Sequence, residues 1–224
     1  MDPRLRSAVD ASVGWYVDVC AVHGVGSILE NGMWSALAPP PRLHSDVVVV
    51  EPEVAADQVL DRMRGRPRGG FKDSFATMDA PDGMELLFSA TWVHREAAQP
   101  PGGGAPSPWS AVTTEEELAE WTASHDTAGV LLPGLLQRAN FRFLARYLGG
   151  RIVAGAVARL GSGVVDVSNV FAVPPGSVDW AELAAAIAVY FPGRPLVGYE
   201  RGEALTSALD SGFVPTGELM VWVR

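Results

Sequence analysis

A tyrosine and a glutamate stand side by side at the end of the short apolar segment PLVGYE, residues 195–200. A carboxylate placed there could act as a general base and a phenol as a general acid, because the pair can take up one proton and release another. Glu200 and Tyr199 are therefore the candidate catalytic residues. The alternative is a surface contact between Glu200 and Arg201, beside a Tyr199 that only packs.

A polar residue also interrupts the apolar segment VVDVSNVFA, which covers residues 164–172. Its alternation predicts a strand in which side chains two positions apart share a face. One face would carry Val165, Val167, Asn169 and Phe171, and the other Asp166 and Ser168. Because a buried amide needs hydrogen-bond partners, Asn169 could bind an amide or a carbonyl of a ligand. The alternative is a structural bond from Asn169 to the backbone of the neighbouring strand.

The same strand runs into a turn and then a helix, in the sequence AVPPGSVDW over residues 172–180. Backbone N–H groups at a helix start can hold a phosphate, so such a junction is typical of coenzyme sites. This one has a single glycine, Gly176, no basic residue, and two prolines that have no N–H to donate. Asp179 and Glu182 would satisfy the positive end of the helix internally. The shape favours a phosphate site, whereas the composition favours a weakened or lost one.

Other residue types that often carry chemistry have no recognisable spacing. The four histidines lack a companion cysteine or carboxylate at metal-ligand spacing, so no metal site is predicted. The sequence contains no P-loop, dinucleotide fingerprint or G-x-S-x-G motif. Tyr147 is better explained as a core residue. Asp73 and Ser74 indicate an ordinary turn, unless the first part of the chain repeats the fold of the second.

The composition describes a globular protein that is not built to bind polyanions. The 224 residues are 48% apolar and 19% charged, and the net charge of −9 includes 16 arginines and a single lysine, Lys72. Nucleic acid and anionic membranes are therefore not expected partners, and the basic cluster at 62–70 indicates a solvated loop. No apolar segment is long enough to span a bilayer, and the first ten residues lack the core of a signal peptide. The lone Cys20 suits a reducing cytoplasm, which is the expected location.

The segment QPPGGGAPSP, residues 99–108, divides the chain. Proline and glycine at this density continue neither a helix nor a central strand, so we expect a linker between an N-terminal α/β part, residues 1–98, and a C-terminal domain, residues 109–224. The C-terminal domain should begin with a helix opened by a Thr114–Glu117 capping box. An antiparallel meander of three strands follows, and then helix, strand, helix and strand. The predicted class is a mixed α/β (α+β) sheet flanked by helices.

The N-terminal part has weaker patterns. They predict a helix over 7–24, a strand over 45–52, a helix over 53–65 and a pair of strands over 71–79 and 84–95. Residues 73–95 and 198–224 both run from a polar strand end to a glycine and then to an apolar strand with a tryptophan and a final arginine. This likeness suggests a diverged internal repeat.

In this order of elements, residues 109–224 resemble the GNAT superfamily of N-acyltransferases. The resemblance rests on the meander FRFLARYLGGRIVAGAVARLGSGVVDVSNVFA, the helix DWAELAAAIAVYF and the ending PLVGYERGEALTSALDSGFVPTGELMVWVR. In that family a short helix and a Gly-Phe pair precede the last strands, and degenerate copies occur in tandem. The resemblance implies a GNAT-like C-terminal half and a reduced GNAT-like N-terminal half, which together would form a tandem pseudo-repeat.

The resemblance also implies a site. Two neighbouring strands, at 164–172 and 195–200 here, separate in that family, and acetyl-CoA or another acyl-CoA lies between them as co-substrate. Its expected contacts are Asn169, Val170, Phe171, Ala172 and Gly176. Of the family's Q/R-x-x-G-x-G/A turn only Gly176 remains. Strand N–H groups would hold the thioester carbonyl, Glu200 would take a proton from a small-molecule amine, and Tyr199 would protonate the leaving thiolate.

Three hypotheses stay open on these grounds. The first is a GNAT-fold acyltransferase that transfers an acetyl or acyl group from acyl-CoA to a small-molecule amine, as a monomer or homodimer. The second is a non-catalytic GNAT-like domain that binds a small molecule or a protein, which the poor turn favours. The third is an acyltransferase with another donor, either a carrier-protein thioester or an aminoacyl-tRNA, and the acidic net charge disfavours the tRNA.

Overall fold

A computed structural model describes residues 1–98, 100 and 107–224. The predicted linker at 99–108 lies largely outside the described residues. The helices are α1 (Pro3–Val22), α2 (Ala56–Arg62), α3 (Glu115–Ser124), the 3-10 turn η1 (Pro133–Leu135), α4 (Trp180–Tyr190) and α5 (Gly202–Asp210). The strands are β1 (Ser27–Glu30), β2 (Met33–Ala36), β3 (Val47–Val49), β4 (Gly70–Asp73), β5 (Glu85–Arg95), β6 (Trp109–Val112), β7 (Phe141–Leu148), β8 (Arg151–Gly161), β9 (Val164–Ala172), β10 (Leu196–Glu200) and β11 (Val214–Val223).

Both halves of the chain contribute to one mixed sheet. Over the described residues it has eleven strands in the order β1-β2-β3-β4-β11-β5-β10-β9-β8-β7-β6. The β3–β4 and β9–β10 pairs are parallel, and each is connected through a helix, as parallel neighbours require. All other neighbours pair antiparallel. The mixed α/β class and the three-strand meander β7-β8-β9 are as predicted.

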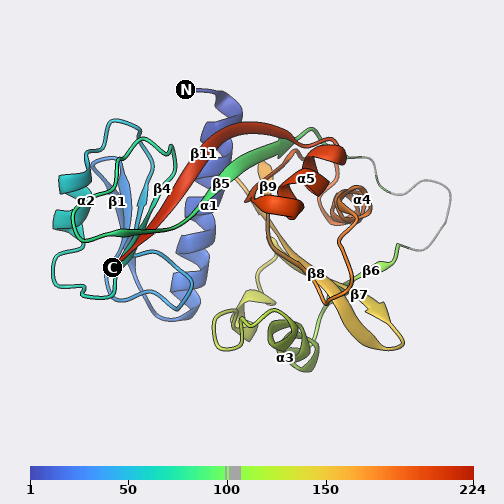
Figure 1. Ribbon diagram of the computed structural model, residues 1–224. Coiled ribbons are helices and arrows are strands. Elements are labelled where there is room, and N and C mark those ends of the chain that lie inside the picture. The colour runs from blue at the N-terminus through green and yellow to red at the C-terminus, as the bar shows by residue number, and fades with distance from the viewer. Residues whose placement is uncertain (99, 101–106) are drawn as a thin grey trace.

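The two long strands β5 and β11 cross between the halves (Figure 1). The predicted pair of 71–79 and 84–95 is wrong, because β11 lies between β4 and β5 and pairs with both. In return, β5 leaves the N-terminal strands and pairs with β10. After β4 the chain crosses to the C-terminal half as β5, and after β10 it crosses to the N-terminal half as β11. Residues 73–95 and 198–224, which are alike in sequence pattern, therefore follow equivalent paths. The sheet runs without a break across the predicted boundary between residues 1–98 and 109–224, so the division of the chain into two domains remains a prediction.

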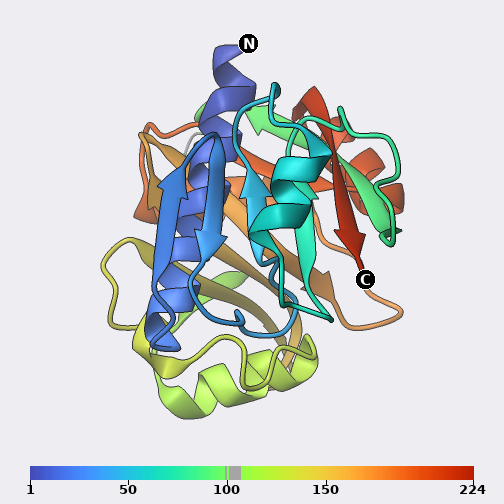
Figure 2. The ribbon, with the colours of Figure 1, turned by 90° about the vertical axis from the view of Figure 1, so that its left-hand side faces the viewer.

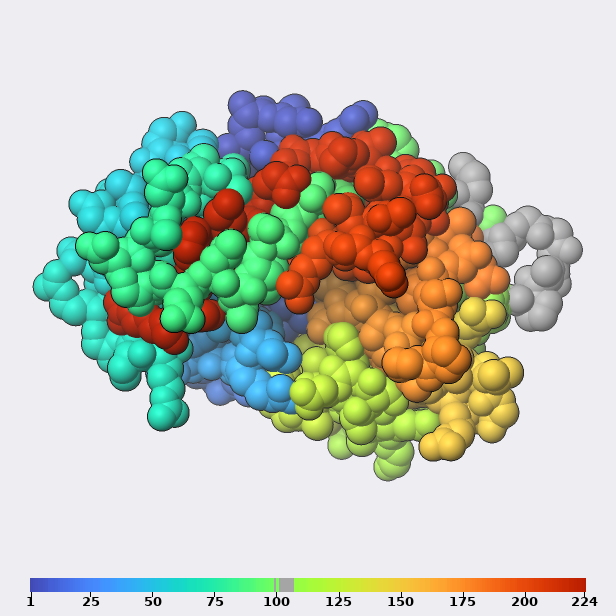
Figure 3. Space-filling view, in the orientation of Figure 1, coloured from blue at the N-terminus to red at the C-terminus, as the bar shows by residue number. Residues whose placement is uncertain are grey.

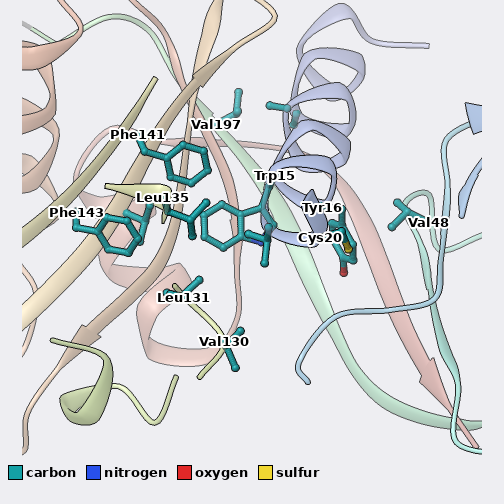
Figure 4. Close-up of a cluster of buried hydrophobic side chains, with 14 of the residues drawn as sticks. Trp15, Tyr16, Cys20, Val48, Val130, Leu131, Leu135, Phe141, Phe143 and Val197 are labelled. Atoms are coloured by element: carbon teal, nitrogen blue, oxygen red, sulfur yellow. The ribbon is translucent and has the colours of Figure 1, made fainter. Parts of the chain in front are cut away.

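Helices cover both faces of the sheet. One face packs under α1 and α3, and the other under α4, α5 and, in the N-terminal half, α2. Figure 2 shows α1 and α2 on opposite sides of the N-terminal strands. The largest cluster joins the halves: Trp15 of α1 lies toward Phe141 and Leu135, while Tyr16 lies on the side of Val48 (Figure 4).

Helix α1 connects the halves through charge as well as packing. It begins at an Asp2 cap, whose carboxylate accepts from the Arg4 N–H at 2.8 Å. Toward its C-terminal end, the buried Asp18 accepts from Arg159 Nε of β8 at 2.6 Å and also pairs with Arg138. A Cβ on Gly14 would lie 2.5 Å from Arg159 Nη1, so the glycine lets the guanidinium approach the helix closely. None of the described helices is long and apolar enough to cross a membrane.

Candidate active site

The candidate site lies where β9 and β10 separate. Their parallel ladder holds only two residue pairs, Leu196 with Val165 and Val197 with Asp166. Beyond Asp166, β9 has no ladder partner on that side within the described part of the chain, whereas β10 continues to pair with β5 as far as Glu200. Two strands predicted to diverge therefore do diverge, and the backbone edge of β9 faces the space between them.

Gly198 stands at this fork and permits the strands to approach before they part. A Cβ at Gly198 would lie 2.6 Å from the Val167 carbonyl oxygen, which is backbone and cannot swing aside. We expect Gly198→Ala to lower the free energy of unfolding by about 1–3 kcal/mol through this overpacking. Chemical denaturation measures the change. Gly134→Ala is the control, since its Cβ would meet nothing closer than 3.4 Å; equal stabilities for the two variants would contradict this account of the fork.

A β-bulge reshapes β9 beside the fork. Against β8, Val157 pairs with Ser168 and Gly155 with Phe171, so two residues of β9 lie opposite Ala156 alone. One of them, Asn169, has a φ of 51°, in the left-handed region that asparagine tolerates better than most residues. The extra residue reverses the alternation of side chains that follow it.

The predicted faces of this strand are therefore wrong beyond Ser168. Val165 and Val167 pack with α4, as do Val170 and Ala172, whereas Phe171 packs on the opposite face. There its ring stacks on His125, with centroids 4.7 Å apart. Strict alternation would have put Phe171 with Val165, and the bulge is the reason that it does not.

A cavity of about 220 Å³ fills the fork. Its wall includes Asp166, Ser168, Asn169 and Val170 from β9, Tyr199 and Glu200 from β10, Ser12 and Tyr16 from α1, and Lys72 from β4. Both candidate catalytic residues thus line one cavity, together with a second carboxyl group. The Asn169 amide Nδ2 donates to Ser168 Oγ of its own strand at 3.2 Å, and not to the backbone of the neighbouring strand as the structural alternative required.

The two carboxyl groups of this cavity ionise near neutral pH. Burial raises the pKa of Glu200 to about 7, although Arg201 acts in the opposite direction. Burial likewise raises the pKa of Asp166 to about 6, against the attraction of Arg159 and Lys72. A carboxylate with a pKa near the working pH is well matched to accepting a proton during a reaction.

Tyr199 is held by aromatic and cationic neighbours. Its ring packs edge-on against Trp92 with centroids 5.3 Å apart, and the Lys72 ammonium lies 4.5 Å from its ring centre. Lys72 lowers the pKa of Tyr199, but burial and the nearby acidic groups raise it by more, so the pKa lies above its ordinary value. Tyr199 therefore keeps its proton at neutral pH, as a proton donor must.

Of the five predicted coenzyme contacts, Asn169 and Val170 line the cavity. Phe171 and Ala172 pack into the two cores on either side of the strand, and Gly176 lies in the following turn. Backbone N–H groups at that turn and at the helix start after it are already hydrogen-bonded within the protein. The Gly176 N–H donates to the Val173 carbonyl at 2.9 Å, and Asp179 accepts from the N–H groups of Ala181 and Glu182.

Several site residues come from the N-terminal half and were not predicted. Lys72 could have been suspected, as the single lysine among 16 arginines and next to Phe71 in a strand. The sequence gives no comparable signal for Ser12 and Tyr16, because the helix that carries them has an ordinary amphipathic pattern. Asp73, by contrast, is structural: its carboxylate accepts from the N–H groups of Phe75, Thr77 and Met78. Among the described residues no His, Cys, Asp and Glu side chains cluster as metal ligands would.

Solved structures resemble this chain, whereas no protein-family model and no curated protein matches its sequence. A GCN5-related N-acetyltransferase from Kribbella flavida is 15% identical with a TM-score of 0.60, over 97% of this chain and 96% of that one. A protein assigned to the GNAT acetyltransferase family, from Novosphingobium aromaticivorans, is 15% identical with a TM-score of 0.64, over 96% and 97%. A GCN5-related N-acetyltransferase-like protein from Streptococcus suis is 12% identical with a TM-score of 0.55, over the whole of both chains.

These likenesses extend through both halves of the chain. The protein therefore has the GNAT fold, and the resemblance drawn from residues 109–224 is confirmed at the level of the fold. Identities of 12–15% establish the fold alone. What the protein does has to be argued from the fork and its side chains.

Proposed function

We propose that this protein is an acyltransferase that moves an acyl group from a thioester to the amine of a small molecule. The observation that carries the proposal is the fork itself, where β9 and β10 separate after two residue pairs around a cavity that holds Glu200 and Tyr199. The names of two similar solved structures, a GCN5-related N-acetyltransferase and a putative acetyltransferase of the GNAT family, agree with it.

In the proposed reaction the amine nitrogen attacks the thioester carbonyl carbon, so that a C–N bond forms and the C–S bond breaks. Glu200 accepts the proton that the amine loses, and Tyr199 gives its proton to the departing thiolate. The products are an amide and a free thiol, and a proton returned from Glu200 to Tyr199 through solvent restores the starting state. The unpaired edge of β9 beside Asn169 supplies backbone N–H groups for the developing negative charge on oxygen.

The fork is better suited to binding the thioester arm of the donor than the turn after β9 is to binding a pyrophosphate. The turn has two prolines, an internally bonded Gly176 and a helix start capped by Asp179, so it offers a phosphate few free donors. The acyl donor is thus an acyl-CoA held mainly by its pantetheine arm, or a carrier-protein thioester that presents the same arm.

The donor can be tested by comparing acetyl-CoA with acetyl-pantetheine. Because the turn contributes little, we expect dissociation constants within about threefold of each other, measured by calorimetry, and release of thiol from both in the presence of a panel of amines. A preference for acetyl-CoA of about 100-fold or more, worth roughly 3 kcal/mol, would show that the turn does bind the pyrophosphate. Failure of both to bind at millimolar concentration would contradict the acyltransferase proposal.

The composition of the turn also favours a second candidate, a GNAT-fold domain that binds a small molecule without chemistry. Ligand binding without thiol release from either donor would support it. In that case Glu200→Gln and Tyr199→Phe would leave the biological role intact, because neither proton transfer would be needed.

A further inference from the structure

A second and larger cavity adjoins the fork on the α1 face of the sheet. It measures about 950 Å³ and shares six lining residues with the small cavity, namely Tyr16, Leu43, His44, Lys72, Asn169 and Tyr199. Its outer wall is the proline-rich loop before β3 and its floor includes Phe88 and Val221 of the crossing strands. Figure 3 shows the surface hollowed between the light-blue segment before β3 and the green β5. A molecule in the fork could therefore extend into this space.

Lys72 lies on the wall between the two cavities and is a buried cation. It is 1% exposed, and its Nζ donates to Ser12 Oγ at 3.0 Å. The rings of Tyr16, Tyr199 and Trp92 surround it at 4.5–5.5 Å. Over the described ranges, no carboxylate oxygen lies within 4.0 Å of this ammonium. Buried charges are ordinarily paired, so one that borders a cavity is suited to pairing with a ligand.

The two cavities differ in the sign of most of their charged side chains. The large cavity is lined by four cationic side chains, Arg42, Arg66, Arg68 and Lys72, and by one acidic residue, Asp46. Arg66 pairs with Asp46, and Arg42 pairs with Asp126 outside the lining. The small cavity is lined by the carboxyl groups of Asp166 and Glu200 and, where it adjoins the large one, by Lys72. In a protein with a net charge of −9, this cationic cavity next to an acidic one is complementary to a molecule with an amine at one end and an anion at the other.

We propose that the acceptor is an amine that also carries an anionic group, with the amine at Glu200 and the anion bound by Lys72. This inference rests on the proposed acyl transfer for the role of the amine, but the anion site at Lys72 can be tested without any reaction. A carboxylate and a phosphate are the two sources of such an anion, and the arms of the experiment distinguish them.

The single lysine makes a direct test possible on the unmodified protein. Labelling with ¹³C,¹⁵N-lysine places one NMR spin system in the whole chain, at Lys72. We expect its side-chain signals to shift saturably with L-leucine or L-phenylalanine, or else with O-phosphoethanolamine. Leucinamide and ethanolamine, which keep the amine and lack the anion, should bind at least about 10-fold more weakly, as loss of a charged contact predicts. If neither these anions nor 100 mM acetate or phosphate shifts the signals, the inference is wrong.

A variant pair completes the test. Lys72→Met should abolish the preference for the anionic compound over its uncharged counterpart, while Arg64→Met, an exposed arginine outside both cavities, should preserve it. If Lys72→Met does not fold, the NMR titration of the unmodified protein still decides. Anion binding without thiol release from a thioester would refute the proposed function and leave the site standing. Thiol release that is equally fast with amines lacking an anion would refute the inference and leave the function standing.

Discussion

Replacing Glu200 by glutamine is expected to lower the rate of acyl transfer by about 100-fold to 10,000-fold, the usual contribution of a positioned general base. Glutamine keeps the shape of the side chain at the end of β10 but cannot accept a proton. Binding of the thioester should change little, because the strands of the fork stay in place. Thiol release under saturating donor measures the loss.

The pH dependence gives this prediction a second readout. Since the base must be ionised and its pKa is raised to about 7 by burial, kcat/KM for the thioester at saturating amine should rise about tenfold per pH unit below 7, with a break in the slope near 7. This rise should vanish in Glu200→Gln. Glu203→Gln, at an exposed position on α5, is the matched control and should keep both the rate and the profile. Full activity in Glu200→Gln would remove Glu200 from the proposed role.

Unfolding of Glu200→Gln is not expected to be the cause of its lost activity. A carboxyl whose folded-state pKa lies above its unfolded value of 4.5 binds more protons when folded, so it costs stability as the pH rises from about 4.5 to about 7. Glu200→Gln removes that cost. The variant should therefore be at least as stable as the parent at pH 8, which thermal unfolding at pH 5 and pH 8 can check.

Replacing Asp18 by alanine is expected to lower the free energy of unfolding by about 3–5 kcal/mol. The side chain of Arg159 is only 10% exposed, and Asp18 holds its Nε at 2.6 Å. Without that carboxylate the guanidinium stays buried with one long bond, of 3.4 Å, to the Ala11 carbonyl. Because Asp18 belongs to α1 and Arg159 to β8, the loss should weaken the packing between the two halves of the structure. Denaturation in urea measures it.

Two further variants test whether the unpaired charge of Arg159 causes the loss of stability in Asp18→Ala. Asp61→Ala breaks the exposed pair with Arg64 and should change stability by no more than about 0.5 kcal/mol. Adding Arg159→Met to Asp18→Ala should recover much of the loss, because it removes the unpaired charge and leaves an apolar chain of similar length. A loss below about 1 kcal/mol for Asp18→Ala alone would show that the buried pair contributes little to joining the halves.

The amino-acid sequence by itself determined the elements of the C-terminal half and the position of the candidate catalytic pair. Thr114 and Glu117 form the capping box at the start of α3, and the strand patterns over 141–148 and 164–172 coincide with β7 and β9. These signals are local: a cap, a glycine turn or a period of two acts between residues close in the chain. The end of β10 at Glu200 is recognisable for the same reason.

Only the tertiary structure decided which strands meet and what surrounds the site. The pairing of β11 with β4, and of β5 with β10, depends on contacts between residues more than 100 positions apart, for which no local period exists. The bulge at Asn169 reverses two faces of one strand through a single backbone conformation that alternation cannot reveal. Lys72 becomes part of the site for the same reason, because α1 and the exchanged strands bring its ammonium to Tyr199 across the sheet. Burial of the two carboxyl groups, and with it their raised pKa values, is likewise a property of the assembled fold.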